Sequence, residues 1–172
     1  MKAPVTRQTV DLAAYPDLVV IYLGMRVKTF GGIKTLLGFG PKIDSAGASR
    51  PDGLLHFENN IFYSFFPLHV GMRWYWKDFE SMERWSRSEP HRLWWKNFIK
   101  SSGGTDLWHE TYFMAGGMEG IYGDATKPVG FQAFAPSIDP RGSMFSARQR
   151  LHKAGDTPAQ PEGVSEQDLY EA

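Results

Sequence analysis

Two histidines are the residues of this chain best suited to moving protons. His91 lies in "MRWYWKDFESMERWSRSEPHRLWWKNF", residues 72–98, a stretch that holds five of the chain's six tryptophans. His109 lies in "LWHETYF", next to the sixth. Because an imidazole has an ordinary pKa of about 6.5, it can accept or donate a proton at neutral pH. We therefore predict His91 and His109 as catalytic acid–base residues at an aromatic pocket; the alternative is that each is a structural histidine.

The spacing around His91 places it beside two tryptophans. His91, Trp94, Trp95 and Phe98 fall at positions i, i+3, i+4 and i+7, which is one face of a helix. Pro90 is tolerated in the first turn of a helix but not in its interior, so we predict that a helix starts anew at "SEPH". Trp94 and Trp95 are predicted as substrate contacts on the face that His91 shares.

Alternation along the strand "LWHETYF" separates His109 and Thr111 on one face from Glu110 and Tyr112 on the other. An inward Arg26 needs a carboxylate partner, because an unpaired buried charge is costly, and we predict Glu110. That pair is either a structural salt bridge or a substrate clamp. The remaining predicted substrate-binding residues are Trp76, Tyr63, Tyr112, Arg26 and Glu110, with the core or a dimer interface as the alternative place for the strand aromatics.

Composition argues against several other chemistries. The chain has no cysteine, which excludes thiolate catalysis, disulfides and cysteine-ligated metals. The 19 basic and 19 acidic residues give a formal net charge of zero, so no basic field exists to attract nucleic acid. His56 and Glu58 alternate on one strand face, but two such residues are too few to predict a metal site. "GGIKTLLGFG" lacks the spacing of a phosphate-binding loop.

Apolar periodicity predicts the order strand–helix–strand–strand–helix–strand. The expected strands are residues 17–29, 54–66, 68–76 and 106–114. A short helix is expected at residues 29–41, ended by Gly38, Gly40 and Pro41, with a loop at residues 44–53. A second helical region is expected to begin at Asp78 and to restart at Ser88, each as an N-cap. This order is that of a ferredoxin-like split βαβ unit, so the predicted fold class is α+β.

Three regions are predicted along the chain: a polar N-terminal arm at residues 1–16, one domain at residues 17–139, and a partly flexible tail at residues 140–172. A short helix near residues 143–153 is expected to contact a partner subunit. The N-terminus lacks the apolar segment of a signal peptide, and no run of about 18 apolar residues occurs, so we predict a cytoplasmic protein without membrane contact.

Three segments resemble a monooxygenase-like family of the dimeric α+β barrel superfamily, alongside the antibiotic-biosynthesis-type monooxygenases: "VVIYLGMRVKTFGGIKTLLGFGP", "YWKDFESMERWSRSEPHRLWWKNF" and "LWHETYFMAGGMEGIYG". The resemblance covers residues 17–135. It implies a ferredoxin-like subunit that forms a homodimer, in which two sheets close into a barrel, with a pocket between each sheet and its helices. Superfamily chemistries include cofactor-independent oxygenation of polyketide-like phenols, haem degradation, haem-dependent aldoxime dehydration, and non-redox isomerisation or lactone chemistry.

One departure from the resemblance bears on the cofactor. Haem-degrading relatives look like W..S..H...H, whereas here Trp94 and Trp95 stand near the place of the second, iron-binding histidine. An indole cannot ligate iron, so we expect no cofactor, with haem on His91 or His109 as the open alternative. The predicted function is a small monooxygenase-like oxidoreductase of secondary metabolism that acts on a hydrophobic, aromatic or polyketide-like molecule by histidine acid–base chemistry. The alternatives are a haem-dependent monooxygenase or dehydratase and a non-catalytic ligand-binding or assembly module.

Overall fold

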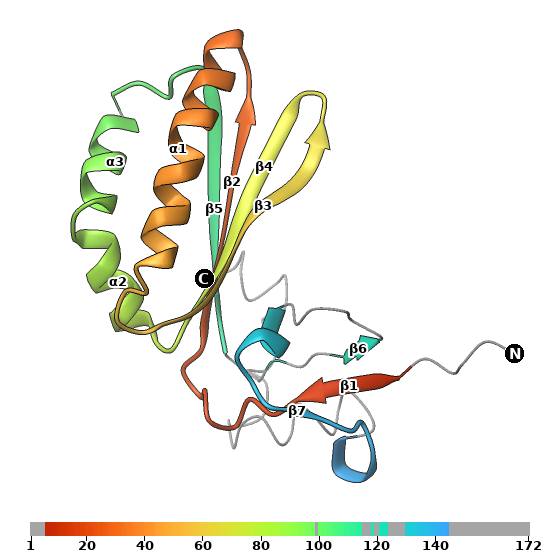
Figure 1. The fold of residues 1–172 in the computed structure, drawn as a ribbon. Helices are drawn as coiled ribbons and strands as arrows, with labels where there is room; N and C mark the ends of the chain where they lie inside the picture. Colours follow the sequence, from red (N-terminus) through yellow and green to blue (C-terminus); the bar gives the residue numbers. More distant parts are fainter. Residues whose placement is uncertain (1–5, 99, 115–117, 119–120, 124–129, 145–172) are drawn as a thin grey trace, which may run out of the picture. The chain divides into compact units, whose positions relative to one another are not determined.

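The computed structural model describes residues 6–98, 100–114, 118, 121–123 and 130–144 of the chain (Figure 1). The chain divides into two compact units. One is Asp17–Phe113, and the other combines residues 1–16 with residues 114–172. Each unit has its own sheet.

The unit Asp17–Phe113 is a four-stranded antiparallel sheet with helices on one face (Figure 1). Its elements are β2 (Val19–Val27), α1 (Phe30–Ala48), β3 (Leu54–Phe65), β4 (Leu68–Trp76), α2 (Phe79–Arg87), α3 (His91–Phe98) and β5 (Thr105–Phe113). The sheet order is β3-β4-β2-β5, so the two strands that start each half, β2 and β4, lie side by side in the centre. This order and topology confirm the predicted α+β class and ferredoxin-like unit.

The second unit contains short strands around the segment predicted as a polar arm. Strand β1 (Arg7–Val10) pairs with β6 (Ile121–Gly123) and with β7 (Ser137–Ile138), and the short helices η1 (Gly130–Ala133) and η2 (Gly142–Met144) complete the described part. Thr9 and Val10 are buried, so this segment is a strand rather than a simple arm. The strand was missed because four residues with a single β-branched hydrophobe give too short a pattern. The predicted tail helix lies largely outside the described residues.

Helix α1 is longer than predicted, because Pro41 lies inside it and the helix continues to Ala48. An interior proline removes one helical hydrogen bond and costs about 3 kcal/mol. Packing of the last two turns offsets that cost: Ala46 belongs to the buried core, and Ile43 packs against it. Gly47 allows the close approach, since a Cβ there would lie 2.7 Å from the Phe57 ring. Tertiary packing thus overrides the local helix-stop signal.

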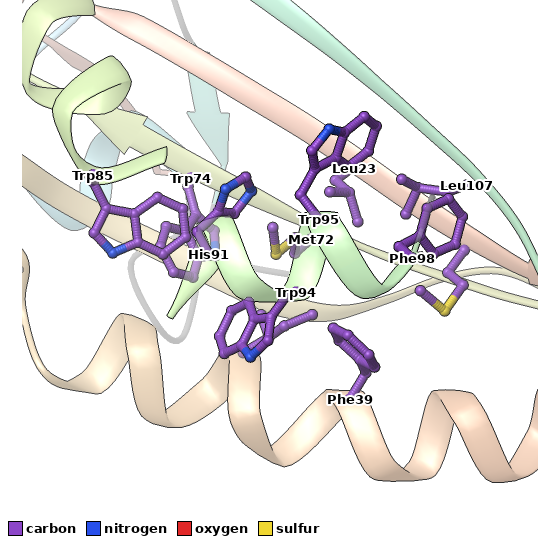
Figure 2. Close-up of a pocket in the computed structure, with 12 residues that line it drawn as sticks. Leu23, Phe39, Met72, Trp74, Trp85, His91, Trp94, Trp95, Phe98 and Leu107 are labelled. Atoms are coloured by element: carbon purple, nitrogen blue, oxygen red, sulfur yellow. The ribbon is translucent and has the colours of Figure 1, made fainter. Parts of the chain in front are cut away.

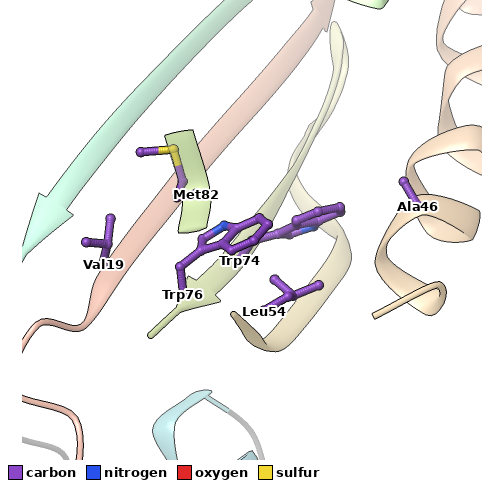
Figure 3. Packing of buried hydrophobic residues seen from close by; sticks show 6 residues of the cluster. All are labelled: Val19, Ala46, Leu54, Trp74, Trp76 and Met82. Carbon is purple, nitrogen blue, oxygen red and sulfur yellow. The ribbon is translucent and has the colours of Figure 1, made fainter. Parts of the chain in front are cut away.

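The core on the helix-facing side of the sheet is built around two tryptophans. Trp74 and Trp76 alternate along β4 and are each 1% exposed, and they pack with Val19, Leu54 and Met82 (Figure 3). The two indole rings lie with centroids 6.1 Å apart. Because each buried indole removes a large apolar area from water, this pair contributes strongly to the stability of the sheet. No described helix has both the length and the apolar character needed to cross a membrane.

Helices α2 and α3 meet at the predicted interruption. Asp78 caps α2, as predicted, because its Oδ1 accepts a hydrogen bond from the Ser81 N–H at 2.7 Å. Ser88 has extended backbone, and its carbonyl accepts from the Arg92 N–H at 2.9 Å, as an N-cap carbonyl does. Its hydroxyl, however, donates to the Trp85 carbonyl at 2.8 Å and so closes the end of α2 instead. Helix α3 begins only at His91, so the predicted restart at an N-cap Ser88, with Pro90 in the first turn, is wrong by two residues.

Candidate active site

A small apolar cavity of about 60 Å³ lies between the sheet and helices α1 and α3 (Figure 2). Twelve side chains line it, and His91 is the one ionisable group among them. The other eleven are Leu23, Met25, Phe39, Ile43, Met72, Trp74, Trp85, Trp94, Trp95, Phe98 and Leu107. An apolar pocket with a single polar group is the usual composition of a small-molecule site.

The ferredoxin-like fold brings these side chains together by simple periodicity. Leu23 on β2 pairs with Met72 on β4, so the two side chains point to the same face of the central strands. On α3, His91, Trp94, Trp95 and Phe98 all line the cavity, which confirms that the i, i+3, i+4, i+7 stripe shares one face. Phe39 of α1 closes the opposite wall, with its ring edge-on to the Trp94 ring at 5.9 Å between centroids.

One ring nitrogen of His91 is fixed by the backbone. Nδ1 lies 2.8 Å from the carbonyl oxygen of Ser86, in the last turn of α2. A carbonyl only accepts hydrogen bonds, so Nδ1 carries the hydrogen and the neutral ring has its lone pair on Nε2. Among the described residues, no side chain or backbone group hydrogen-bonds to Nε2. His91 therefore offers an unshared lone pair in an apolar site.

The surroundings of His91 favour its neutral form. Burial lowers the pKa of the imidazole below its ordinary value of 6.5; the hydrogen bond to the Ser86 carbonyl works in the opposite direction, and a charge on His109 lowers it further. The ring packs against Trp85 with centroids 4.9 Å apart. At neutral pH the Nε2 lone pair is thus available as a base or as a ligand.

His109 lies near this site but does not line the cavity. It pairs with Leu23 on β2, two positions along β5 from the cavity residue Leu107, and so shares its face of the sheet. The predicted alternation along "LWHETYF" is therefore confirmed. The side chain is exposed to solvent, and its influence on His91 is electrostatic rather than by contact.

The other predicted binding residues separate into three places. Trp94 and Trp95 line the cavity, while Trp76 lies in the core cluster instead. The remaining four, Tyr63, Tyr112, Arg26 and Glu110, lie on the opposite face of the sheet or at its edge, away from the helices. Sequence spacing gave their strand face but could not tell which of the two faces the helices cover.

The predicted ion pair between Arg26 and Glu110 is wrong. Its guanidinium lies 2.7 Å from the Asp106 carboxylate, because the register sets Arg26 opposite Asp106 and places Glu110 opposite Tyr22. Glu110 instead accepts a hydrogen bond from the Tyr112 hydroxyl, on the strand face that the two residues were predicted to share.

A polar network on the helix-free face was missed from the sequence. Arg73 on β4 donates from Nε to the Glu58 carboxylate at 2.6 Å and also donates to the Tyr22 hydroxyl. The Tyr75 hydroxyl donates to the same carboxylate at 3.3 Å, and burial raises the pKa of that tyrosine. Arg73 and Glu58 lie directly opposite each other on paired strands, so the signal was the strand register, which spacing within one segment does not give.

The described residues contain no group of three or more His, Asp or Glu side chains that could hold a metal ion. For haem, the donor chemistry of His91 is suitable, since a metal-ligating histidine commonly donates its other N–H to a backbone carbonyl. The cavity volume is not suitable for haem, because about 60 Å³ is well below the ~300–1,000 Å³ of ordinary small-molecule sites. With the side chains in these positions, the cavity does not fit a macrocycle.

The fold and the cavity define a ferredoxin-like α+β protein with a histidine in an aromatic cleft between sheet and helices. A family model described as monooxygenase af470-like matches residues 18–131, and the chain belongs to this family. This match confirms the predicted resemblance to a monooxygenase-like family. No curated protein matches the sequence.

Among solved structures, the chain is similar to an aldoxime dehydratase determined in complex with butyraldoxime, with 25% identity and a TM-score of 0.65 over 87% of this chain and 44% of that one. A second aldoxime dehydratase structure gives 22% identity and a TM-score of 0.64, over 88% and 46% of the two chains. This chain thus spans less than half the length of those enzymes. SnoaB, a cofactor-independent oxygenase from Streptomyces nogalater, gives 10% identity and a TM-score of 0.41 over 56% of this chain and 91% of that one.

Proposed function

We propose that this protein is a monooxygenase-like enzyme that oxidises a hydrophobic, aromatic or polyketide-like small molecule, with His91 as the general base. The observation that carries the proposal is that His91 lines an otherwise apolar, aromatic cavity and has no hydrogen-bond partner at Nε2 among the described residues. Membership of the monooxygenase af470-like family supports the reaction class. A role in secondary metabolism follows from that substrate class and stays a prediction.

In the proposed reaction, Nε2 of His91 removes a proton from an acidic C–H group of the bound phenol or anthrone, which gives a delocalised carbanion. The carbanion is oxidised by dioxygen, and the new C–O bond forms a peroxide that takes the proton back from the imidazolium. The hydroperoxide then loses water to leave a carbonyl. One CH₂ group and one O₂ thus become one C=O group and one H₂O, and no external reductant is needed.

The aromatic walls have a separate task in this proposal. The rings of Trp95 and Phe98 stack at 6.1 Å between centroids, and Trp94 and Phe39 form the facing edge. Flat side chains of this kind hold a planar substrate and keep water from the carbanion. His109 is proposed as a second acid–base group at the edge of the cleft, where it is exposed.

We also propose that the protein acts as a homodimer. This chain covers less than half of the aldoxime dehydratase chain that it resembles, so two copies would match its length. The sheet face away from the helices carries exposed aromatic side chains, Tyr63 at 42% and Tyr112 at 48%, which a second copy would cover. Analytical ultracentrifugation tests this proposal, and a monomer at micromolar concentration would contradict it.

Oxygen uptake with an anthrone, a tricyclic aromatic ketone with an acidic CH₂ group, tests the reaction. The purified protein is expected to raise the rate of oxygen uptake above the rate without protein, with one O₂ consumed per quinone formed. A rate equal to that without protein, for an anthrone that binds, would overturn the proposed chemistry.

A haem-dependent enzyme is the second candidate. The likeness to aldoxime dehydratases and the Nε2 lone pair of His91 favour it. The His91 cavity of about 60 Å³ is too small alone for haem, as it is for an anthrone, so its size does not separate the two candidates. Expression with haem supplied and a search for a Soret absorption band in the purified protein distinguish the candidates. A Soret band that disappears in His91→Ala would support the haem-dependent enzyme. A colourless protein that oxidises the anthrone as fast as protein made without added haem would exclude it.

A non-catalytic binding module, the remaining alternative, would be favoured if both histidines pointed to solvent or to partners that use all of their hydrogen-bonding groups. His109 is exposed, but His91 has an unshared nitrogen at the cavity. This arrangement favours the enzyme.

A further inference from the structure

A second cavity of about 250 Å³ adjoins the His91 cavity on the other side of α1. It lies between α1 and the β3–β4 hairpin, and its own lining is mainly aliphatic, from Leu36, Leu37, Leu68 and Val70. Leu37 is 67% exposed and Phe62 54% exposed, so the cavity is open to solvent on the side where these side chains lie.

The two cavities share one wall. Leu23, Met25 and Met72 of the sheet and Phe39 and Ile43 of α1 line both of them. A single layer of side chains therefore separates the His91 cavity from the second one. Two of the five are methionines, whose unbranched side chains change rotamer readily to suit a ligand.

The linings of the two cavities suit different chemical groups. The His91 cavity is mostly aromatic, which suits a planar ring, whereas the second cavity is mostly aliphatic and suits a flexible chain. Two asparagines, Asn59 and Asn60, also line the second cavity. The Asn59 amide is engaged elsewhere, since it donates to Asp44 at 2.6 Å and accepts from the Trp74 indole at 3.0 Å. The His91 cavity is too small alone for a substrate of ordinary size, and the second adds most of the space.

We propose that one substrate occupies both cavities, with its ring beside His91 and an unbranched hydrocarbon tail beneath α1 in the second cavity. This inference rests on the proposed function and specifies its substrate class as an alkyl-substituted aromatic molecule. The tail enters between Leu37 and Phe62 and is held by burial of its methylene groups, with no polar partner required.

Helix α1 supplies a matched pair of variants for the test. Gly40 lines the second cavity, and a Cβ at this position meets no atom within 4 Å, so Gly40→Leu fills the cavity without displacing the fold. Gly38 is equally open and lines neither cavity, so Gly38→Leu is the control. Both substitutions raise helix propensity, and neither is expected to impair folding.

The experiment measures binding of para-alkylphenols, from para-cresol to para-octylphenol, by quenching of tryptophan fluorescence. Affinity for the wild-type protein and for Gly38→Leu is expected to rise about three- to fourfold per added methylene, the factor for burying a CH₂ group. In Gly40→Leu the rise is expected to stop after the first few methylenes, while para-cresol binds as in the wild type. An affinity that does not depend on chain length, or the same dependence in all three proteins, would overturn the inference.

The n-alkanols of matching chain length separate this inference from the proposed function. If the alkanols bind to the wild type but not to Gly40→Leu, and para-cresol does not bind, the tail cavity is supported and the aromatic site at His91 is wrong. If para-cresol binds and chain length has no effect, the aromatic site stands and the tail cavity fails. If neither series binds, both are wrong.

Discussion

The Nδ1 atom of His91 lies 2.8 Å from the backbone carbonyl oxygen of Ser86, which joins the first residue of α3 to the last turn of α2. The sequence interruption at residues 88–90 creates this geometry, because the chain turns between the two helices and returns the imidazole to the end of α2. The hydrogen bond fixes the tautomer, and the lone pair is left on Nε2. The first residue of α3 is thus held in one orientation by the end of α2.

The lowered pKa of His91 predicts a pH-dependent contribution to stability. Because burial disfavours the imidazolium in the folded state, the unfolded chain binds more protons below its own histidine pKa of about 6.5, and the free energy of unfolding falls as the pH decreases through that range. In His91→Asn this part of the decrease is expected to disappear. Urea unfolding of both proteins from about pH 8 to about pH 5 measures it. If the free energy of unfolding depends on pH in the same way in the wild type and in His91→Asn, the prediction is wrong.

Two arginines on the sheet are expected to differ in their contribution to stability. Arg73 is partly buried and hydrogen-bonded to Glu58, so Arg73→Ala is expected to lower the free energy of unfolding by about 1–3 kcal/mol. Arg26 forms an exposed ion pair with Asp106, and Arg26→Ala is expected to lower it by about 0.2–1 kcal/mol. Urea unfolding compares them, and an equal or larger loss in Arg26→Ala would refute the network's role.

Two glycines of α1 are expected to respond in opposite directions to alanine. Gly38→Ala meets open space and is expected to stabilise the protein by about 0.5–1 kcal/mol through helix propensity. Gly47→Ala would place a Cβ 2.7 Å from the Phe57 ring, so it is expected to destabilise by about 1–3 kcal/mol through overpacking. Thermal unfolding of both variants checks the signs. A stabilised Gly47→Ala would mean that α1 does not approach β3 this closely.

Much of the fold was predictable because its local patterns are strong. The β-branched run at β2, the proline between β3 and β4, and the Asp78 cap each specify an element without help from distant residues. The same holds for the helical stripe of His91, Trp94 and Trp95, which was placed correctly around the cavity.

The errors arose where distant packing decides the outcome. Pro41 is a helix-stop signal, yet Ile43 and Ala46 gain enough contact with the core for α1 to continue. The partner of Arg26 and the network of Arg73 depend on strand register, which a single strand's pattern does not contain. Trp76 and Tyr63 were predicted to bind the substrate, but neither lines the cavity. Trp76 is buried in the core cluster, and Tyr63 lies on the sheet face away from the helices.

The rate of oxygen uptake with an anthrone, compared between the wild type and His91→Asn, tests the central claim most directly. Removing a general base is expected to lower the rate about 10²- to 10⁴-fold, while near-ultraviolet circular dichroism of the tryptophans shows an unchanged fold. His109→Asn, at an exposed position, is expected to have the smaller effect of the two. A His91→Asn variant that folds and turns over the anthrone at the wild-type rate would contradict the account.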